Sequence, residues 1–343
     1  MTMLCRSSKY LSTSIFARTV LKLLCISAAA GFVFSGCRGS RNSAPVSQQV
    51  RKFPAVDIPA MITDPAESID YAVEHFWDRF LDTTFTGKCD SVMVSGVTRQ
   101  EVENSFGTYS TLLWQTASSK AYKSVASLFA RAEAAELRDT SSNVFETITS
   151  LAYKYFYDPN SPVRNEEFYL PYVEGLAHSP AVKDAMKPAY SYDASMCSLN
   201  RIGQPAADFS FTDLAGRRHT LYGVKADYTL LFFSNPGCKS CKEITDVLVS
   251  EPAITSMLAS GRLAVVNVYI DQELDKWREY AAGYPSEWLS GYDQSYIIRT
   301  DQIYSVRAIP SLYLLDTEKK VILKDAPQDR VFALLSALST QGQ

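Results

Sequence analysis

Hydrophobic residues in the first half of the chain recur every three or four positions, which is the spacing of one face of an α-helix. Between residues 64 and about 190 this spacing is clearest at Ile69, Val73, Phe76 and Phe80. It recurs in three later segments, 122–137, 144–157 and 164–176. Four or five amphipathic helices joined by short polar loops predict a compact, all-α helical bundle, which we assign to residues 61–190.

Local signals mark where some of these helices begin and end. Asp64-Pro65 combines an N-cap residue with a proline at the first helical position. Thr98-Arg99-Gln100-Glu101 has the spacing of a capping box, in which the two outer side chains cap the helix reciprocally. The prolines within 158–162 are expected to end the segment 144–157, because proline cannot continue a helix.

The pattern changes after residue 200, where continuous apolar runs replace the helical spacing. Residues 228–233, Tyr-Thr-Leu-Leu-Phe-Phe, are typical of a strand buried on both faces. Further strands are expected at 263–270, 311–315 and 321–324, a hairpin at 208–211 and 219–222, and helices starting near 238, 251, 272 and 328. This alternation predicts an α/β sandwich with a central mixed sheet over residues 200–343.

The start of the chain has the pattern of a secretory signal over residues 1–36. Basic residues and no acidic ones precede an apolar run at 23–34, which Ser35 and Gly36 connect to Cys37. The run has 12 residues, against the roughly 20 that a membrane-spanning helix needs. We therefore expect a cleaved signal rather than a retained membrane anchor.

Phe34-Ser35-Gly36-Cys37 resembles a bacterial lipobox, in which the cysteine is lipidated and becomes the new N-terminus. A lipidated Cys37 would tether a soluble protein to a membrane, and the polar residues after it predict a flexible tether over 37–60. Surface-export signals of Bacteroidetes-type lipoproteins carry acidic residues here, whereas this chain has Arg38 and Arg41. We expect a membrane-anchored protein of the cell envelope that faces the periplasm; cleavage near Gly36 without lipidation is the alternative.

Composition and charge exclude several classes of function. The chain is 46% hydrophobic and 21% charged, and its net charge of −3 becomes −7 once the four basic residues of 1–36 are removed. An acidic protein with scattered basic residues is not expected to bind nucleic acid. His75, His178 and His219 form neither a close pair nor a cluster with cysteine at metal-ligand spacing, so we expect no metal and no other cofactor.

Cys238-Lys239-Ser240-Cys241 lies where the buried strand 228–233 is followed by a helix. Unpaired backbone N–H groups and the helix dipole favour a thiolate at such a position. Cys238 can therefore attack a disulfide, and Cys241, one helical turn on, can resolve the mixed disulfide. A zinc half-site would need a second pair of ligands, and a purely structural disulfide is the other alternative.

Ile309-Pro310 stands at the entrance of the predicted strand 311–315 and supports the same site. A proline at the start of an interior strand needs a reason, because it cannot donate a ladder hydrogen bond. A cis Ile309–Pro310 bond supplies one, at a cost of about 0.5–1 kcal/mol. A trans proline at the strand start is the alternative.

These features together resemble the membrane-tethered, thioredoxin-like thiol-disulfide oxidoreductases of the bacterial periplasm. The resemblance covers 203–340 and depends on the cysteine pair and the segments 203–209, 230–233 and 308–316. It implies that Cys238 is the exposed nucleophile, that Cys241 is the resolving thiol, and that substrate backbone docks at Ile309 beside the cis residue Pro310. It also implies protein thiols or disulfides as substrates, together with an electron donor or acceptor.

The helical half resembles an uncharacterised domain that precedes such modules in Bacteroidetes-type lipoproteins. This resemblance depends on the segments 75–80 and 157–162. It implies no activity for the bundle. The sequence therefore leaves the role of this domain open.

Three positions depart from the thioredoxin pattern. Gly237 stands where thioredoxins have tryptophan, and Phe232 stands where they have a buried acid. Related tethered proteins have a glutamate at the position of Ile244, whereas here Glu243 is one place early. The base that deprotonates Cys241 and the direction of the reaction, reducing or oxidising, stay open.

Two other functions and one pairing also stay open. The chain is alternatively an anchored binding or adaptor module with a secondary redox site. A thiol peroxidase-like redoxin is less favoured, because Leu231 and Asn235 replace the Pro and Thr/Ser that precede the peroxiredoxin cysteine. Cys89 and Cys197 would pair in an oxidising compartment only if the fold brought their sulfur atoms together.

Overall fold

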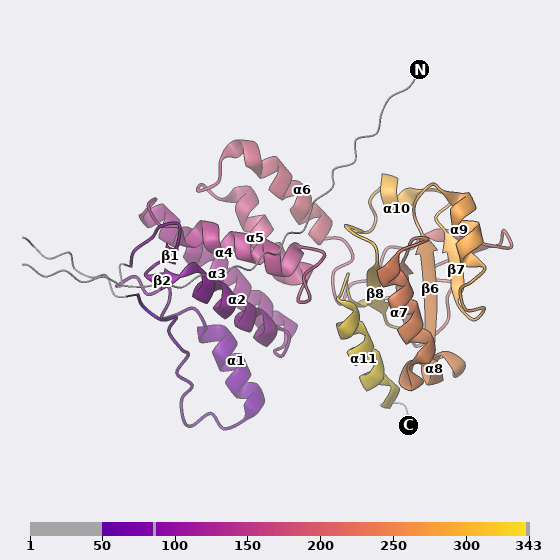
Figure 1. Ribbon diagram of the computed structural model, residues 1–343, viewed down its shortest axis with the longest axis horizontal. Helices are drawn as coiled ribbons and strands as arrows, with labels where there is room; N and C mark the ends of the chain where they lie inside the picture. The colour runs from indigo at the N-terminus through magenta and orange to yellow at the C-terminus, as the bar shows by residue number, and fades with distance from the viewer. Residues whose placement is uncertain (1–49, 85–86, 341–343) are drawn as a thin grey trace, which may run out of the picture. The chain divides into compact units, whose positions relative to one another are not determined.

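The computed structural model describes residues 50–84 and 87–340, and in these residues a helical region precedes an α/β region (Figure 1). The predicted fold class, an α/β domain preceded by a helical one, is confirmed, although the helical region is not purely α because it also contains a two-stranded hairpin over 93–98 that the sequence did not predict. The helical region contains α1 (Pro65–His75), α2 (Arg99–Leu113), α3 (Ser118–Arg138), α4 (Val144–Ala152), the π-helix η1 (Tyr153–Tyr157), α5 (Glu166–His178), the 3-10 helix η2 (Asp184–Met186) and α6 (Lys187–Cys197), with a short hairpin of β1 (Met93–Val94) and β2 (Val97–Thr98).

The predicted helix starts are correct, but the capping box closes on one side only. The Asp64 side chain accepts a hydrogen bond from the Glu67 N–H at 2.9 Å, and the Thr98 hydroxyl accepts one from the Glu101 N–H at 3.2 Å. The Glu101 carboxylate does not turn back to its own helix start, because it accepts a hydrogen bond from the Phe53 N–H at 2.8 Å. A partner distant in the sequence has replaced the local one.

Packing in the helical region starts earlier and ends later than the sequence predicts. The Phe53 ring stacks on Phe80 at 5.1 Å and meets Trp77 edge-on at 5.3 Å, so the last part of the predicted tether packs against the core. Helix α6 lies beyond the predicted last helix, and its only buried residue is Cys197. Because α6 lacks an apolar stripe, hydrophobic spacing gives no signal for it.

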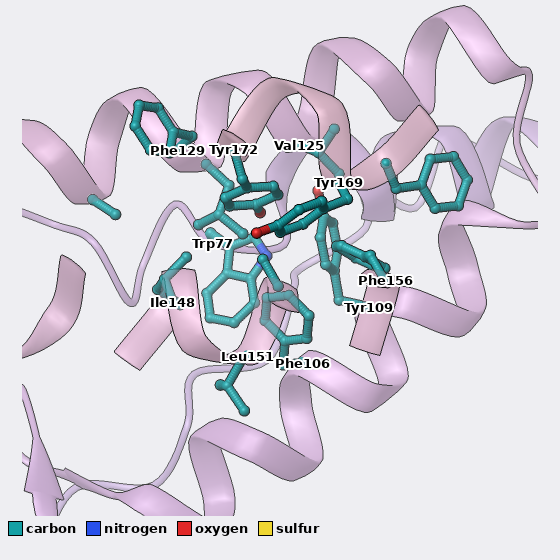
Figure 2. Close-up of a cluster of buried hydrophobic side chains, with 14 of the residues drawn as sticks. Trp77, Phe106, Tyr109, Val125, Phe129, Ile148, Leu151, Phe156, Tyr169 and Tyr172 are labelled. Carbon is teal, nitrogen blue, oxygen red and sulfur yellow. The ribbon is translucent and has the colours of Figure 1, made fainter. Parts of the chain in front are cut away.

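The core of the helical region is rich in aromatic side chains. Trp77, Phe106, Tyr109, Phe156 and Tyr172 are buried, and Figure 2 shows their rings gathered between the helices. Most neighbouring rings meet tilted or edge-on at 5.3–6.2 Å, the arrangement that aromatic quadrupoles favour. These aromatic side chains therefore fill the core of the helical region.

The α/β region is built on one seven-stranded mixed sheet (Figure 1). Its strands are β3 (Ser210–Asp213), β4 (Arg218–Thr220), β5 (Tyr228–Phe233), β6 (Leu263–Tyr269), β7 (Leu289–Tyr292), β8 (Ser311–Leu315) and β9 (Val321–Leu323), in the order β4-β3-β7-β6-β5-β8-β9. Strands β5, β6 and β7 are parallel to one another, and every other pairing is antiparallel. The helices are α7 (Lys239–Ser250), α8 (Pro252–Ala259), α9 (Leu274–Ala281), α10 (Ile297–Thr300) and α11 (Gln328–Thr340).

Strand β7 and helix α10 were not predicted. The β7 sequence Leu-Ser-Gly-Tyr lacks both the alternation and the apolar run of a strand. It forms because Gly291 lies close against β3: a Cβ atom there would come within 2.6 Å of the Phe211 ring and 2.8 Å of the Thr212 carbonyl oxygen. Tertiary packing therefore determines this strand.

Strand β5 is buried on both faces, as its apolar run predicts. Leu230 and Phe232 belong to a core that α7, α8 and α11 cover, whereas Leu231 and Phe233 belong to a second core on the opposite face. The sheet centre is thus a packed two-sided core in which β5 is fixed.

None of the helices in the described residues is long and apolar enough to cross a membrane.

We expect Phe106→Ala to destabilise the protein by about 3–5 kcal/mol, because it deletes a buried ring that contacts several other rings. Urea unfolding followed by circular dichroism measures this loss. Met61→Ala is the control, since its side chain is 87% exposed and such changes usually stay within about 0.5 kcal/mol. Equal midpoints for the two variants would contradict the assignment of Phe106 to the core.

Candidate functional site

Cys238 and Cys241 form a disulfide at the start of α7. Their Cα atoms are 5.2 Å apart, within the usual range for a disulfide. Cys238 is the N-cap residue, and its sulfur accepts a hydrogen bond from the Cys241 N–H at 3.1 Å. Cys238 is half-buried, whereas Cys241 is only 3% exposed. An incoming sulfur atom therefore reaches Cys238 first.

The backbone conformation at Gly237 explains why this position, where thioredoxins have tryptophan, is a glycine here. Its φ is +73°, in the left-handed region that favours glycine. A Cβ atom at this position would meet nothing within 4 Å. The glycine is therefore required by the turn that leads to Cys238, and not by crowding.

Strand register brings the segment with Pro310 to the same end of the sheet as the cysteines. Phe233, the last residue of β5, pairs with Ser311, the first residue of the antiparallel β8. The Ile309–Pro310 peptide bond is cis, as expected. Cys238 and Ile309 both pack against the core beneath α7. The four residues predicted for the catalytic and docking site thus lie at one end of the sheet: Cys238 and Cys241 at the start of α7, after β5, and Ile309 and Pro310 in the loop before β8.

A cavity of about 220 Å³ opens beside the disulfide. Both cysteines line it, together with Asn235 and the aromatic side chains of Tyr280 and Tyr284. Tyr280 is 46% exposed. The aromatic part of the lining is therefore open to a bound partner, and Lys242, Thr245 and Asp246 of α7 add polar groups to the same cavity. Sequence reasoning missed both tyrosines, because they come about 40 residues after the cysteines and carry no motif.

Phe232 and Ile244, two of the positions that differ from the thioredoxin pattern, have apolar surroundings. Phe232 and Ile244 are fully buried in the core beneath α7. Glu243 is exposed and its carboxylate lies 3.5 Å from the Lys239 ammonium. None of these three side chains supplies a buried acid beside Cys241, so none of them is the proton acceptor for its thiol.

Polar side chains do lie behind the site. The Ser234 hydroxyl donates to the Asn267 side-chain oxygen at 2.5 Å and lies 3.2 Å from the Tyr284 hydroxyl. Asn235 donates to the Asp271 carboxylate at 2.8 Å. These bonds satisfy buried polar groups at the end of β5, and they hold the strand that delivers the chain to Cys238.

The other two cysteines in the described part of the chain do not pair. Cys89 and Cys197 are both free, which corrects the possibility of a disulfide between them. Cys197 is fully buried at the end of α6, where burial and the nearby Glu166 carboxylate raise the pKa of its thiol. Cys89 lies in the loop before β1, where its sulfur accepts a hydrogen bond from the Ser95 N–H at 3.4 Å. Cys37, the predicted lipidation site, lies outside the described residues.

The histidines are dispersed in the structure as in the sequence. His75 lies 2.7 Å from Asp78, His178 faces the Glu174 carbonyl oxygen at 2.8 Å, and His219 lies 3.0 Å from Asp213. Within 50–84 and 87–340, no group of three or more His, Cys, Asp and Glu side chains is arranged to hold a metal ion.

Two family descriptions match the chain. Residues 36–200 match a domain of unknown function, DUF5106, and residues 226–321 match the family described as thioredoxin-like. Among curated proteins no match is found.

Solved structures give similar proteins from Bacteroides. A thioredoxin-like protein from Bacteroides caccae is 35% identical, covers 84% of this chain and 99% of its own, and has a TM-score of 0.71. The C-terminal domain of an uncharacterized protein from Bacteroides fragilis is 42% identical over 40% of this chain and 98% of its own, with a TM-score of 0.39. The thioredoxin domain of a thiol-disulfide oxidoreductase from Bacteroides vulgatus is 21% identical over 40% of this chain and 98% of its own, with a TM-score of 0.36.

The Bacteroides caccae protein decides the family, because the match spans nearly all of that chain and includes both the helical and the α/β regions of this one. The disulfide at the start of α7 and the cis bond before β8 lie in the α/β region. The chain therefore belongs to the thioredoxin-like proteins, with a thioredoxin-like domain preceded by a DUF5106 domain.

Proposed function

We propose that the protein is a thiol-disulfide oxidoreductase that exchanges electrons with protein thiols through Cys238 and Cys241. The observation that carries this proposal is the disulfide at the N-terminus of α7, with one sulfur accessible and the other buried. This asymmetry separates an attacking position from a resolving one. A disulfide with a purely structural role would gain nothing from one accessible sulfur at a helix start.

The proposed exchange takes two steps, in which atoms and electrons balance. A substrate thiolate attacks the Cys238 sulfur and breaks the bond to Cys241, which leaves as a thiolate and takes a proton. A second substrate thiolate then attacks the substrate sulfur of the mixed disulfide and releases Cys238 as a thiolate. The substrate loses two electrons and the protein gains them, and the same steps run backwards when the reduced protein reduces a substrate.

Local electrostatics favour Cys238 as the thiolate. Its sulfur already accepts the Cys241 N–H hydrogen bond, and the helix dipole adds partial positive charge at the first turn. Lys239 and Lys242 add two cations on that turn, although their pairing with Glu243 and Asp246 reduces their effect. A stabilised Cys238 thiolate is a good leaving group when the second substrate thiolate attacks the mixed disulfide.

The aromatic cavity indicates a peptide substrate whose cysteine is next to an apolar or aromatic residue. Such a side chain would enter the space between Tyr280 and the cysteines while its own cysteine bonds to Cys238. Burying an apolar side chain there stabilises the mixed disulfide in proportion to the area removed from water.

The proposed setting is the periplasmic side of the cell envelope, with Cys37 as the lipid anchor. Support for this setting comes from the basic, apolar and small-residue pattern of 1–36 and from the lipobox-like Phe34-Ser35-Gly36-Cys37. An oxidising compartment is also where a protein disulfide persists.

Cys241→Ala is expected to accumulate mixed disulfides on Cys238, because the resolving thiol is gone. Non-reducing gels of cells that express this variant should show adducts that dithiothreitol releases. The matched control is Cys238→Ala, which keeps one thiol but removes the accessible one and should trap nothing. Failure of Cys241→Ala to trap any partner, together with no exchange between the parent protein and a cysteine peptide, would refute the oxidoreductase proposal.

After reduction, Cys238 is expected to react with iodoacetamide at pH 7 while Cys197 stays unmodified. Cys197 is fully buried and its pKa is raised by that burial, so little thiolate is present or reachable. Peptide mass spectrometry before and after unfolding in urea distinguishes the two thiols. Alkylation of Cys197 in the folded protein at the rate of Cys238 would show that α6 opens readily.

Tyr280→Ala is expected to weaken exchange with a Phe-Cys peptide by about 1–2 kcal/mol, because it removes one apolar wall of the cavity. Exchange with a small aliphatic disulfide that does not fill the cavity should keep its rate. Tyr192→Ala, which also removes a half-exposed tyrosine, is the control away from the site. If both variants behave alike with the Phe-Cys peptide, the cavity does not select the substrate.

A further inference from the structure

A buried cluster of charged side chains joins the DUF5106 domain to the loop that contains Pro310. We call it the Glu166 cluster, after the first residue of α5. The Glu166 carboxylate lies 2.9 Å from Nε of Arg307 and 2.7 Å from Nζ of Lys324. The side chains of Glu166 and Lys324 are each 1% exposed. Arg307 stands three residues before Pro310.

The cluster holds the Pro310 loop on both of its sides. Before the cis bond, the Ser305 hydroxyl donates to Glu166 Oε1 at 3.0 Å. After it, the Ser311 hydroxyl donates to Asp325 Oδ1 at 2.8 Å. The guanidinium of Arg307 connects the two carboxylates, because its Nε forms the ion pair with Glu166 and its Nη2 donates to Asp325 Oδ2 at 2.8 Å. The loop 305–311 is thus fixed by two carboxylates, one of them from the DUF5106 domain.

The surrounding groups compensate the buried charge. The Lys324 ammonium donates to the carbonyl oxygens of Cys197 and Leu199 at 2.6 Å, at the end of α6, where the helix dipole favours a cation. The Arg307 guanidinium lies over the Tyr157 ring, 4.2 Å from its centre.

A third cation completes the cluster. Arg164 donates to the carbonyl oxygens of Asp325 and Ala326 at 2.9 Å and 3.1 Å. Charges buried in this way persist only when they are paired and hydrogen-bonded. Removing one partner therefore leaves an opposite charge of the cluster buried without compensation.

We propose that Glu166 is a positioning residue for disulfide exchange: through Arg307 and Ser305 it holds the 305–311 backbone in the conformation on which substrate docks. This inference rests on the proposed oxidoreductase function and assigns the DUF5106 domain a part in it. Glu166 touches neither cysteine, so its loss should affect docking of the substrate and leave the chemistry of Cys238 unchanged.

The test uses Glu166→Gln in the full chain, which keeps the side-chain shape and removes the charge. We expect the rate constant for exchange with a Phe-Cys peptide disulfide to fall about tenfold, since small misplacements of a docking group have effects of that order or larger. The alkylation rate of reduced Cys238 with iodoacetamide should stay at the parent value. A structural defect that spread to the cysteines would change both rates.

The neighbouring residue offers a matched control. Glu167 also pairs with an arginine, Arg201, at 2.7 Å, but its hydrogen bonds go to Arg201 and to the Ile202 N–H instead of to 305–311. Glu167→Gln makes the same chemical change one residue away, and peptide exchange should stay within about twofold of the parent rate.

Arg307→Lys tests the same device without removing a charge. A lysine cannot span two carboxylates as the guanidinium fork does, so peptide exchange should fall as in Glu166→Gln. Arg307→Lys therefore tests the positioning role even if Glu166→Gln folds poorly.

The outcomes separate this inference from the function on which it rests. If the parent protein exchanges with the peptide while Glu166→Gln and Arg307→Lys do so at parent rates, the positioning role is wrong and the oxidoreductase proposal stands. A parallel fall in peptide exchange and in alkylation of Cys238 would also overturn the positioning role. If the parent protein itself shows no exchange, the proposed function fails, and this inference fails with it.

Discussion

Strand β5 is hydrogen-bonded on both edges and buried on both faces, so a shift of one residue would move each apolar side chain to the wrong core. This constraint fixes where the strand ends, and hence where the turn at Gly237 and the helix start at Cys238 fall. The antiparallel pairing of Phe233 with Ser311 then fixes the end of the neighbouring loop. The relation of the cysteines to Pro310 is therefore a consequence of sheet register.

Much of this arrangement could be predicted because it depends on local or periodic signals. The run 228–233 and the spacing of the two cysteines can be interpreted from neighbouring residues alone. The strand has the predicted bounds. Strand β7 could not be found in this way, because it depends on the close approach of Gly291 to β3, which is a tertiary contact. Glu101 illustrates the same limit, since its carboxylate binds Phe53, 48 residues away, and does not complete a local cap.

The aromatic and ionic parts of the site were beyond sequence reasoning for a related reason. A glutamate at a helix start, as at Glu166, is ordinarily solvated and favourable at the helix dipole. Here tertiary contacts bury it against Arg307 and Lys324. Likewise, Tyr280 carries no motif and becomes part of the cavity only because α9 ends beside α7. Burial of apolar groups can be predicted from their spacing along the chain, whereas burial of polar groups depends on tertiary contacts.

The π-helix η1 carries one further consequence. It closes with a hydrogen bond from the Asp158 N–H to the Tyr153 carbonyl oxygen at 2.9 Å, which spans five residues, whereas an α-helix spans four. Such a turn is equivalent to one inserted residue, and one residue rotates the later side chains about the helix axis by about 100°. Tyr157, the last residue of η1, carries the ring under Arg307. A homologue without that extra residue would turn this ring away from the guanidinium and would need another group to shield the charge.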